Sequence, residues 1–138
     1  MNEFKNKSIL IVGATGVLGK ETARHLLKDG ATQITITGRS LPKVIATKED
    51  LLSSVNTYAT IEAYGGFDML DPIKIEAAVQ QLSSVFDIVF LGAGGVFFTD
   101  EYQTIKWNNH EVEKTVFQNL FGSHVVLQSL KKYNLLSE

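Results

Sequence analysis

The sequence predicts an α/β fold in which a doubly wound parallel sheet is covered by helices on both faces. Three observations carry this prediction. Short runs rich in Ile, Leu and Val alternate with helical patterns, the first run ends in a glycine-rich loop, and the length of 138 residues is that of one domain. We therefore expect a single domain over residues 1–138, with four strands that alternate with four helices, ending after the fourth strand and its helix.

The first half of the chain is expected to contain three strands and two helices. The first two strand patterns are made of aliphatic and β-branched residues, whereas the third is weaker and ends at a glycine pair. Gly30 is a natural stop for the first helix, and Pro42 is tolerated in the first turn of the second. The expected strands are 8–12, 33–37 and 57–63, and the expected helices are 17–29 and 42–54.

The second half is expected to contain one strand between two helices. Asp71 is a suitable N-cap and Pro72 suits the first helical position. We expect a helix over 72–84, a strand within 85–95 and a long helix over about 109–133. The apolar side of the long helix is expected to comprise Val112, Val116, Phe117, Leu120, Phe121, Val125 and Leu127. Such a sheet would leave the edge of its fourth strand open.

Composition excludes several classes of partner. The net charge is −2, and Lys and Arg are spread along the chain, so we expect neither nucleic acid nor an anionic membrane surface as a partner. Lys5 and Lys7 precede an apolar run as in a secretory signal, but glycines interrupt that run, and no apolar stretch is long enough to span a bilayer. The absence of cysteine fits a reducing compartment, and a cytoplasmic location is expected.

The glycine-rich loop invites comparison with two phosphate-binding loops. A nucleoside-triphosphate loop has the pattern G-x-x-x-x-G-K-[ST]. Here its first glycine would fall on Ala14 and its hydroxyl on Glu21, whose carboxylate would repel phosphate. The sequence therefore disfavours a triphosphate site.

A dinucleotide loop fits better, with the spacing G-x-x-G-x-x-G. Gly13 would permit a tight turn out of the strand, Gly16 would let the backbone approach a pyrophosphate, and Gly19 would allow close packing of helix on sheet. The alternative is a plain tight turn between a strand and a helix.

The end of the second expected strand bears on which dinucleotide would bind. A free ribose 2′-hydroxyl calls for Asp or Glu there, whereas a 2′-phosphate calls for a cation. The sequence offers "TITGRS", with Arg39 and no carboxylate. Because arginine can form paired, charge-assisted bonds to a phosphate, we predict NADP(H) as the cofactor in preference to NAD(H). The alternative is that Arg39 is a solvated surface charge.

Five segments in order resemble the short-chain dehydrogenase/reductase family, which has a Rossmann-like fold. They are "VGATGVLG", "TGRS", "GFDMLDP", "DIVFLGAGG" and "VFQNLFGSHVVLQSL". In the fourth, Leu91 and Gly92 stand where the family has two asparagines. The resemblance implies cofactor contacts from Gly13, Thr15, Gly16, Val17, Leu18, Gly19, Arg39, Ser40, Asp68, Met69, Ala93 and Gly94, with Asp68 placed at the adenine.

The resemblance also implies hydride transfer between a nicotinamide dinucleotide and a small carbonyl or alcohol substrate. Asn119 matches an asparagine that in the family supports a proton relay through water, and it is also a candidate for a buried polar group. The family's catalytic Ser and Tyr-x-x-x-Lys lie on the next strand and helix, which are absent from this chain. We therefore expect the 138 residues alone to be inactive. No metal site is expected, because the three histidines lack ligand spacing.

Two alternatives stay open. The chain could be a short, non-catalytic nucleotide-binding or regulatory module that covers its fourth strand by pairing with a second copy, and a homo-oligomer is the expected state. The loop could also bind no nucleotide at all. The sequence does not identify the substrate or the direction of the reaction.

Overall fold

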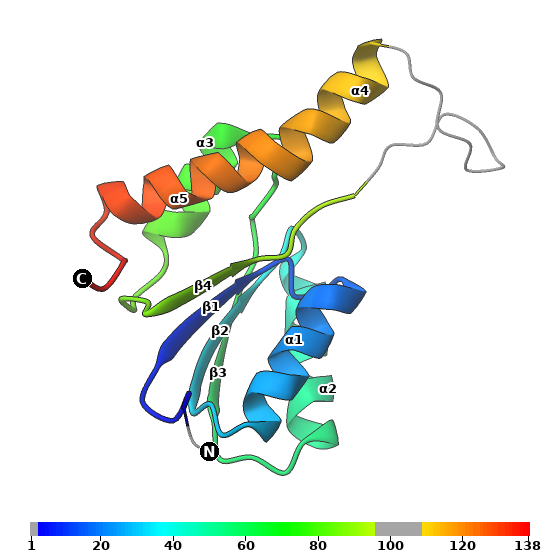
Figure 1. Cartoon of the computed structure of the whole chain (residues 1–138). Coiled ribbons are helices and arrows are strands. Elements are labelled where there is room, and N and C mark those ends of the chain that lie inside the picture. The colour runs from blue at the N-terminus through cyan, green and yellow to red at the C-terminus, as the bar shows by residue number, and fades with distance from the viewer. Residues whose placement is uncertain (1–2, 96–108) are drawn as a thin grey trace, which may run out of the picture.

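The strands form one parallel sheet in the order β3-β2-β1-β4, as Figure 1 shows. The computed structural model describes residues 3–95 and 109–138. The parallel pairing aligns Ile9 with Ile34 on one side of β1 and with Ile88 on the other. The strands are β1 (Ser8–Val12), β2 (Gln33–Thr37), β3 (Thr60–Tyr64) and β4 (Ile88–Leu91). The fold class predicted from the sequence is confirmed.

Helices cover both faces of this sheet (Figure 1). The first two helices and the β-strand residues Ile9 and Ile11 share one core cluster, whereas Leu10 and Val12 share the other with the later helices. This alternation follows from the period of two along a strand. The helices are α1 (Val17–Lys28), α2 (Leu41–Ser54), α3 (Pro72–Gln80), α4 (Asn109–Val116), the π-helical turn η1 (Phe117–Phe121) and α5 (Gly122–Lys132).

Local chemistry explains most of the element boundaries. The Asp71 side chain caps α3 as predicted, accepting from the N–H groups of Ile73 and Lys74 at 3.1 Å each. Gly30, just after α1, has a φ of +92°, the conformation expected of a glycine stop. The third strand begins three residues later than predicted, because the Thr57 hydroxyl accepts the N–H of Ala59 in a local turn instead.

The apolar face predicted for the long helix is wrong in part. Of its seven members, four are exposed, namely Val116, Leu120, Phe121 and Leu127. The buried positions are Gly122, Val126, Ser129 and Leu130, which recur at helical spacing and pack toward α3. Small residues lie on this face because the backbones approach closely: a Cβ on Gly122 would lie 2.6 Å from the Met69 carbonyl oxygen. The buried side therefore combines small residues, where the backbones approach closely, with the core residues Val126 and Leu130.

The edge of β4 is used in part by the last residues of the chain. Phe86 forms a parallel bridge with Leu136, and the Ser137 N–H donates to the Phe86 carbonyl at 2.9 Å. Along Ile88–Leu91, no other described strand pairs with this edge. Among the described residues, β4 is therefore an edge strand of the sheet beyond Phe86. Within residues 3–95 and 109–138, no helix has the length and apolar character needed to cross a membrane.

A polar cluster joins α3 to the end of α5. Glu76 Oε1 accepts a hydrogen bond from the Tyr133 hydroxyl at 2.6 Å and pairs with Lys132, while Gln80 donates to the same hydroxyl at 2.5 Å. The hydrogen bonds from Lys132 and Tyr133 hold the pKa of Glu76 below its usual 4.5, and the bond to Glu76 raises the pKa of Lys132 above its usual 10.5. Folding therefore favours the charged form of both groups.

Replacing Glu76→Gln is expected to lower the thermal midpoint by a few degrees near neutral pH. Because the folded-state pKa of Glu76 is lowered, its contribution is full above pH 4.5 and is lost as the pH falls through that folded-state pKa. The contribution of Lys132 is full below pH 10.5 and is lost as the pH rises through its raised pKa. In circular dichroism melts, the difference in thermal midpoint between the variant and wild type should be constant between these pH limits and should vanish in strong acid. The exposed Glu49→Gln is the control, and a difference that persisted in strong acid would contradict this account.

Candidate functional site

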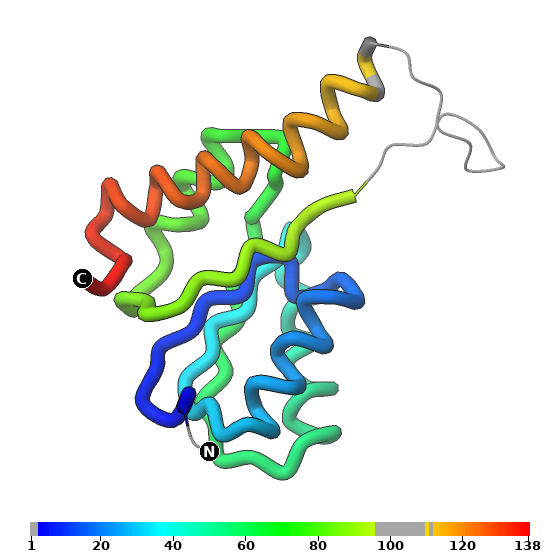
Figure 2. The backbone as a smooth tube through the Cα atoms, viewed as in Figure 1, coloured from blue at the N-terminus to red at the C-terminus, as the bar shows by residue number. Residues whose placement is uncertain are grey.

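The loops that follow all four strands lie at the carboxyl end of the sheet (Figure 2). Residues of these loops line a cleft. Its volume is about 190 Å³. In open parallel sheets, ligands bind in this place, where the strand order reverses between β1 and β4. The lining residues are Gly13, Thr15, Gly16, Gly38, Arg39, Phe67, Asp68, Met69, Gly92, Ala93, Gly94 and Gln118.

Two glycines are required by the backbone around the cleft. Gly13 has a φ of +85°, and a Cβ on it would lie 2.5 Å from the backbone nitrogen of Ala93. A Cβ on Gly19 would lie closer than 3.0 Å to the Gly13 carbonyl oxygen. The N–H groups of Gly13 and Ala14 both donate to the Thr37 carbonyl, at 3.1 and 2.9 Å. The loop is therefore fixed against the ends of β2 and β4, and Gly19 packs inside it rather than lining the cleft.

The start of α1 is suited to an anion. Gly16 is its N-cap and has no side chain to accept from the first N–H groups, which have no partner within the helix. Val17 and Leu18, both predicted cofactor contacts, are 84% and 66% exposed at this end of the helix. The first turn has no acidic residue. Backbone N–H groups and the helix dipole thus favour a phosphate here.

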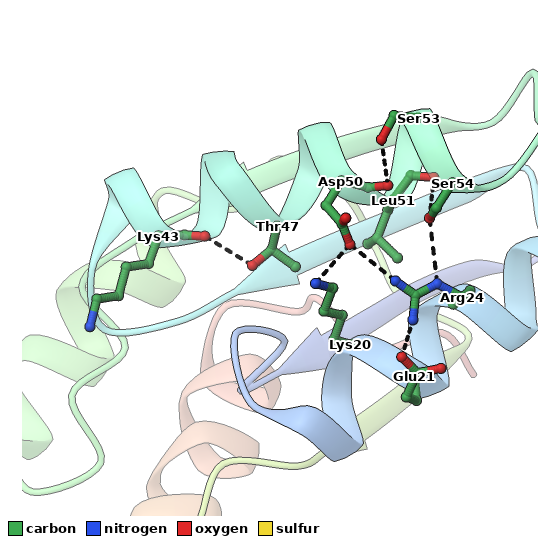
Figure 3. Close-up of polar contacts among 9 residues, drawn as sticks. All are labelled: Lys20, Glu21, Arg24, Lys43, Thr47, Asp50, Leu51, Ser53 and Ser54. Atoms are coloured by element: carbon green, nitrogen blue, oxygen red, sulfur yellow. Dashed lines mark hydrogen bonds and ion pairs between the residues drawn. The ribbon is translucent and has the colours of Figure 1, made fainter.

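The side chains that follow the loop point away from the cleft. Figure 3 shows Lys20 and Arg24 on α1 directed to Asp50 on α2, at 2.7 and 3.0 Å, while Glu21 pairs with Arg24. The hydrogen bond from Lys20 lowers the pKa of Asp50 below its usual value. In a triphosphate-binding loop the lysine would contact the phosphates. Because Lys20 pairs with Asp50 instead, the structure, like the sequence, disfavours a triphosphate site.

The end of β2 supplies a cation to the cleft. Arg39 is exposed and lines the cleft, and its guanidinium has no hydrogen bond or ion pair with any residue in 3–95 or 109–138. Its carbonyl accepts the N–H of Gly66 at 3.1 Å, which holds the backbone in place. Ser40 is the N-cap of α2 and does not line the cleft. Arg39 is therefore anchored at its backbone and available at its charged end.

The end of β3 supplies a carboxylate. Asp68 Oδ1 accepts the N–H of Leu70 at 3.1 Å, and Oδ2 lies 3.7 Å from Lys74 Nζ. The Asp68 side chain is 23% exposed. Phe67 and Met69 on either side are buried, which fixes the segment. The carboxylate is thus oriented and retains acceptor capacity toward the cleft.

The end of β4 is held by Asn119. Its Oδ1 accepts the N–H of Gly95 at 3.0 Å, and its Nδ2 donates to the carbonyls of Gly95 and Thr115 at 2.5 and 2.8 Å. Asn119 is exposed, so it is not a buried polar group, but its amide does satisfy backbone groups, the other role considered for it. The turn η1 directs it toward the loop after β4. A Cβ on Gly94 would collide with its Oδ1. Asn119 therefore positions the loop that contains Ala93 and Gly94.

Eight of the twelve predicted cofactor residues line the cleft, and sequence reasoning missed four others. The four predicted residues outside the lining are Val17, Leu18, Gly19 and Ser40. The four missed residues are Gly38, Phe67, Gly92 and Gln118. The first three adjoin predicted residues, so extending each motif by one position would have found them. For Gln118, the only feature of the sequence that could have indicated a place in the cleft was its position next to Asn119.

A tyrosine with a lysine four residues later occurs in this chain, at Tyr102 and Lys106. This pair precedes α4, whereas the family's Tyr-x-x-x-Lys follows the strand after the long helix. Both residues lie outside the described part of the chain.

Comparison with known proteins identifies relatives of this chain. The model of the KR domain family matches residues 8–96. The 3-ketodihydrosphingosine reductase of Dictyostelium discoideum is 29% identical over 136 residues, covering 88% of this chain and 40% of the reductase. The chain thus spans about 40% of the length of the curated relatives it matches.

Solved structures share the fold at lower identity. The 3-oxoacyl-[acyl-carrier protein] reductase from Brucella melitensis has a TM-score of 0.77 at 23% identity, over 96% of this chain and 48% of that one. Actinorhodin polyketide ketoreductase, solved with NADPH, has a TM-score of 0.71 at 22% identity, over 96% and 49%. The sheet and its flanking helices therefore have the same arrangement as in these reductases.

Proposed function

The chain belongs to the short-chain dehydrogenase/reductase family, matching its KR domain, and on that premise we propose that its cleft binds NADP(H) for the reduction of a carbonyl or the oxidation of an alcohol. The family supports an oxidoreductase with a nicotinamide-dinucleotide-binding module. Our proposal includes three further parts: a preference for the 2′-phosphate, the substrate class and a cytoplasmic location.

One observation carries it: the glycine loop, the Asp68 carboxylate and Arg39 line the same cleft, and the Arg39 guanidinium has no partner among the described residues. Each fits a different part of the dinucleotide. The start of α1 suits the pyrophosphate, Arg39 suits the 2′-phosphate, and Asp68 can accept from the adenine amino group. No carboxylate stands at the end of β2, where one would repel a 2′-phosphate.

When bound, the reduced dinucleotide would donate a hydride to a carbonyl, and the oxidised dinucleotide would accept one from an alcohol. The residues of this chain bind and orient it. The glycine loop and the start of α1 hold its phosphates, and the loop after β4, fixed by Asn119, forms the wall of the cleft. We propose that a Ser and a Tyr-x-x-x-Lys outside these residues complete the reaction, so the 138 residues alone would bind NADPH without turning over substrate.

Titration of the labelled chain with NADPH, followed by amide chemical shifts, tests the proposal. We expect the largest shifts at Gly13, Gly16 and Ala93, and none at the far end of the sheet near Ser8 and Thr60. Absence of shifts at millimolar NADPH would overturn it. A carbonyl reduction rate typical of intact enzymes would contradict the part that places catalytic residues elsewhere.

The open edge of β4 favours a second candidate, a non-catalytic module that dimerises through this strand. Ile88–Leu91 carry no charge and are all half-buried, so pairing with a second copy would bring no like charges together. Light scattering separates the two: a stable dimer supports the module, whereas a monomer that aggregates supports the reductase.

A further inference from the structure

Among the described residues, Gln118 is the one cleft residue contributed by the α4–η1–α5 helix. Its side chain is half-buried, and its amide has no hydrogen-bond partner within residues 3–95 and 109–138. A half-buried amide with two donors and an acceptor is costly to leave unpaired unless water or a ligand serves it. The Gln118 amide is therefore available to bind a polar group of a ligand in the cleft.

The helix holds Gln118 between two other walls of the cleft. Its Nε2 lies 2.9 Å from the position that a Cβ on Gly95 would take, which places the amide over the loop after β4. One turn further on, Gly122 packs against Met69, next to Asp68 in the loop after β3. The amide is thus carried on a segment anchored to both loops.

The backbone at this point is specialised. Gln118 and Asn119 lie within the π-helical turn η1, which interrupts the α-helical run between α4 and α5. Such turns are rare and occur frequently at functional sites, because the extra residue changes which side chains share a face. Here consecutive residues serve two purposes: Asn119 binds the Gly95 backbone while Gln118 reaches the cleft.

Resting on the proposed function, we propose that Gln118 reads the adenine base of the cofactor together with Asp68. Asp68 is an acceptor only, whereas the Gln118 amide both accepts and donates. The adenine amino group has two hydrogens, one for each acceptor, and a glutamine amide pairs with the amino group and N7 of adenine. The two side chains then form a pattern that adenine satisfies.

Hypoxanthine breaks this pattern because it has a carbonyl in place of the amino group. That carbonyl would face the Asp68 carboxylate, and the Gln118 amide would meet two acceptors in place of a donor and an acceptor. The chain should therefore bind NADPH more tightly than reduced nicotinamide hypoxanthine dinucleotide phosphate. Part of that preference should depend on Gln118.

The test compares the dissociation constants of these two dinucleotides by calorimetry for wild type, Gln118→Leu and the control Gln128→Leu. Gln128 is exposed on α5 and does not line the cleft. We expect Gln118→Leu to weaken NADPH binding about tenfold, to weaken the hypoxanthine analogue less, and so to reduce the preference for adenine. Gln128→Leu should change neither constant.

The possible outcomes distinguish failure of the base-reading role of Gln118 from failure of the proposed NADP(H) binding. Equal loss for both dinucleotides would show that Gln118 only supports the loop at Gly95 and would overturn the base-reading role. Unchanged NADPH binding in Gln118→Leu would overturn it too. If wild type binds neither dinucleotide, the proposed function itself fails, and that result is distinct from a failure of the Gln118 variant alone.

Discussion

Replacing Gly13→Ala is expected to abolish detectable NADPH binding and to destabilise the fold by about 3 kcal/mol. The residue has a φ of +85°, where a side chain is strained, and its new Cβ would lie 2.5 Å from the Ala93 nitrogen. The nearest atoms all belong to the backbone of Gly92 and Ala93, so no flexible side chain can move aside. Relief of the collision would push the glycine loop away from the loop after β4 and open the phosphate site.

Gly66→Ala is a matched control, because it separates backbone strain from the collision. Gly66 also has a positive φ, +84°, but the nearest atom to its Cβ would be Ala78 Cβ at 3.5 Å, an ordinary contact. We expect a loss of about 1 kcal/mol and a much smaller change in NADPH affinity than for Gly13→Ala. Urea unfolding and calorimetry measure both quantities. If Gly13→Ala behaved like Gly66→Ala, the close approach of the two loops would not matter for binding.

Replacing Arg39→Ala is expected to weaken NADPH binding by about 10- to 100-fold and to leave NADH binding unchanged. Hydrogen bonds to charged groups contribute about 1.5–3 kcal/mol, and each 1.4 kcal/mol is a factor of ten. The guanidinium has no partner to lose among the described residues, so the fold should keep its stability.

Lys43→Ala is the control for general charge. Lys43 lies in the first turn of α2, is exposed and does not line the cleft. The Lys43→Ala substitution should change NADPH affinity only slightly, and this small change should disappear as the salt concentration is raised. If Lys43→Ala weakened NADPH binding as much as Arg39→Ala, the effect would come from net charge, and Arg39 would not read the 2′-phosphate.

Sequence was sufficient where local chemistry determines structure. The strands 8–12 and 33–37 were predicted at their observed bounds, because aliphatic runs flanked by turn residues have few alternatives. The Asp71-Pro72 cap is equally local. The glycine loop was placed correctly because its spacing reports both a turn and a close approach between backbone segments.

Sequence was insufficient where tertiary contacts decide. The long helix has large apolar side chains on several faces, so periodicity did not show that Gly122 and Ser129 mark the side that packs on α3. The π turn leaves no mark in composition, and without it the placement of Gln118 in the cleft was not foreseeable. The bridge between Phe86 and Leu136 joins residues fifty apart and depends on the whole sheet.

The central claim is that this cleft binds NADP(H) through the glycine loop and Arg39. The most direct test is calorimetric titration of the unmodified chain with NADPH and, separately, with NADH under identical salt and pH. The account predicts saturable binding of one NADPH per chain, at least about tenfold tighter than NADH. Equal affinities, or tighter binding of NADH, would contradict it.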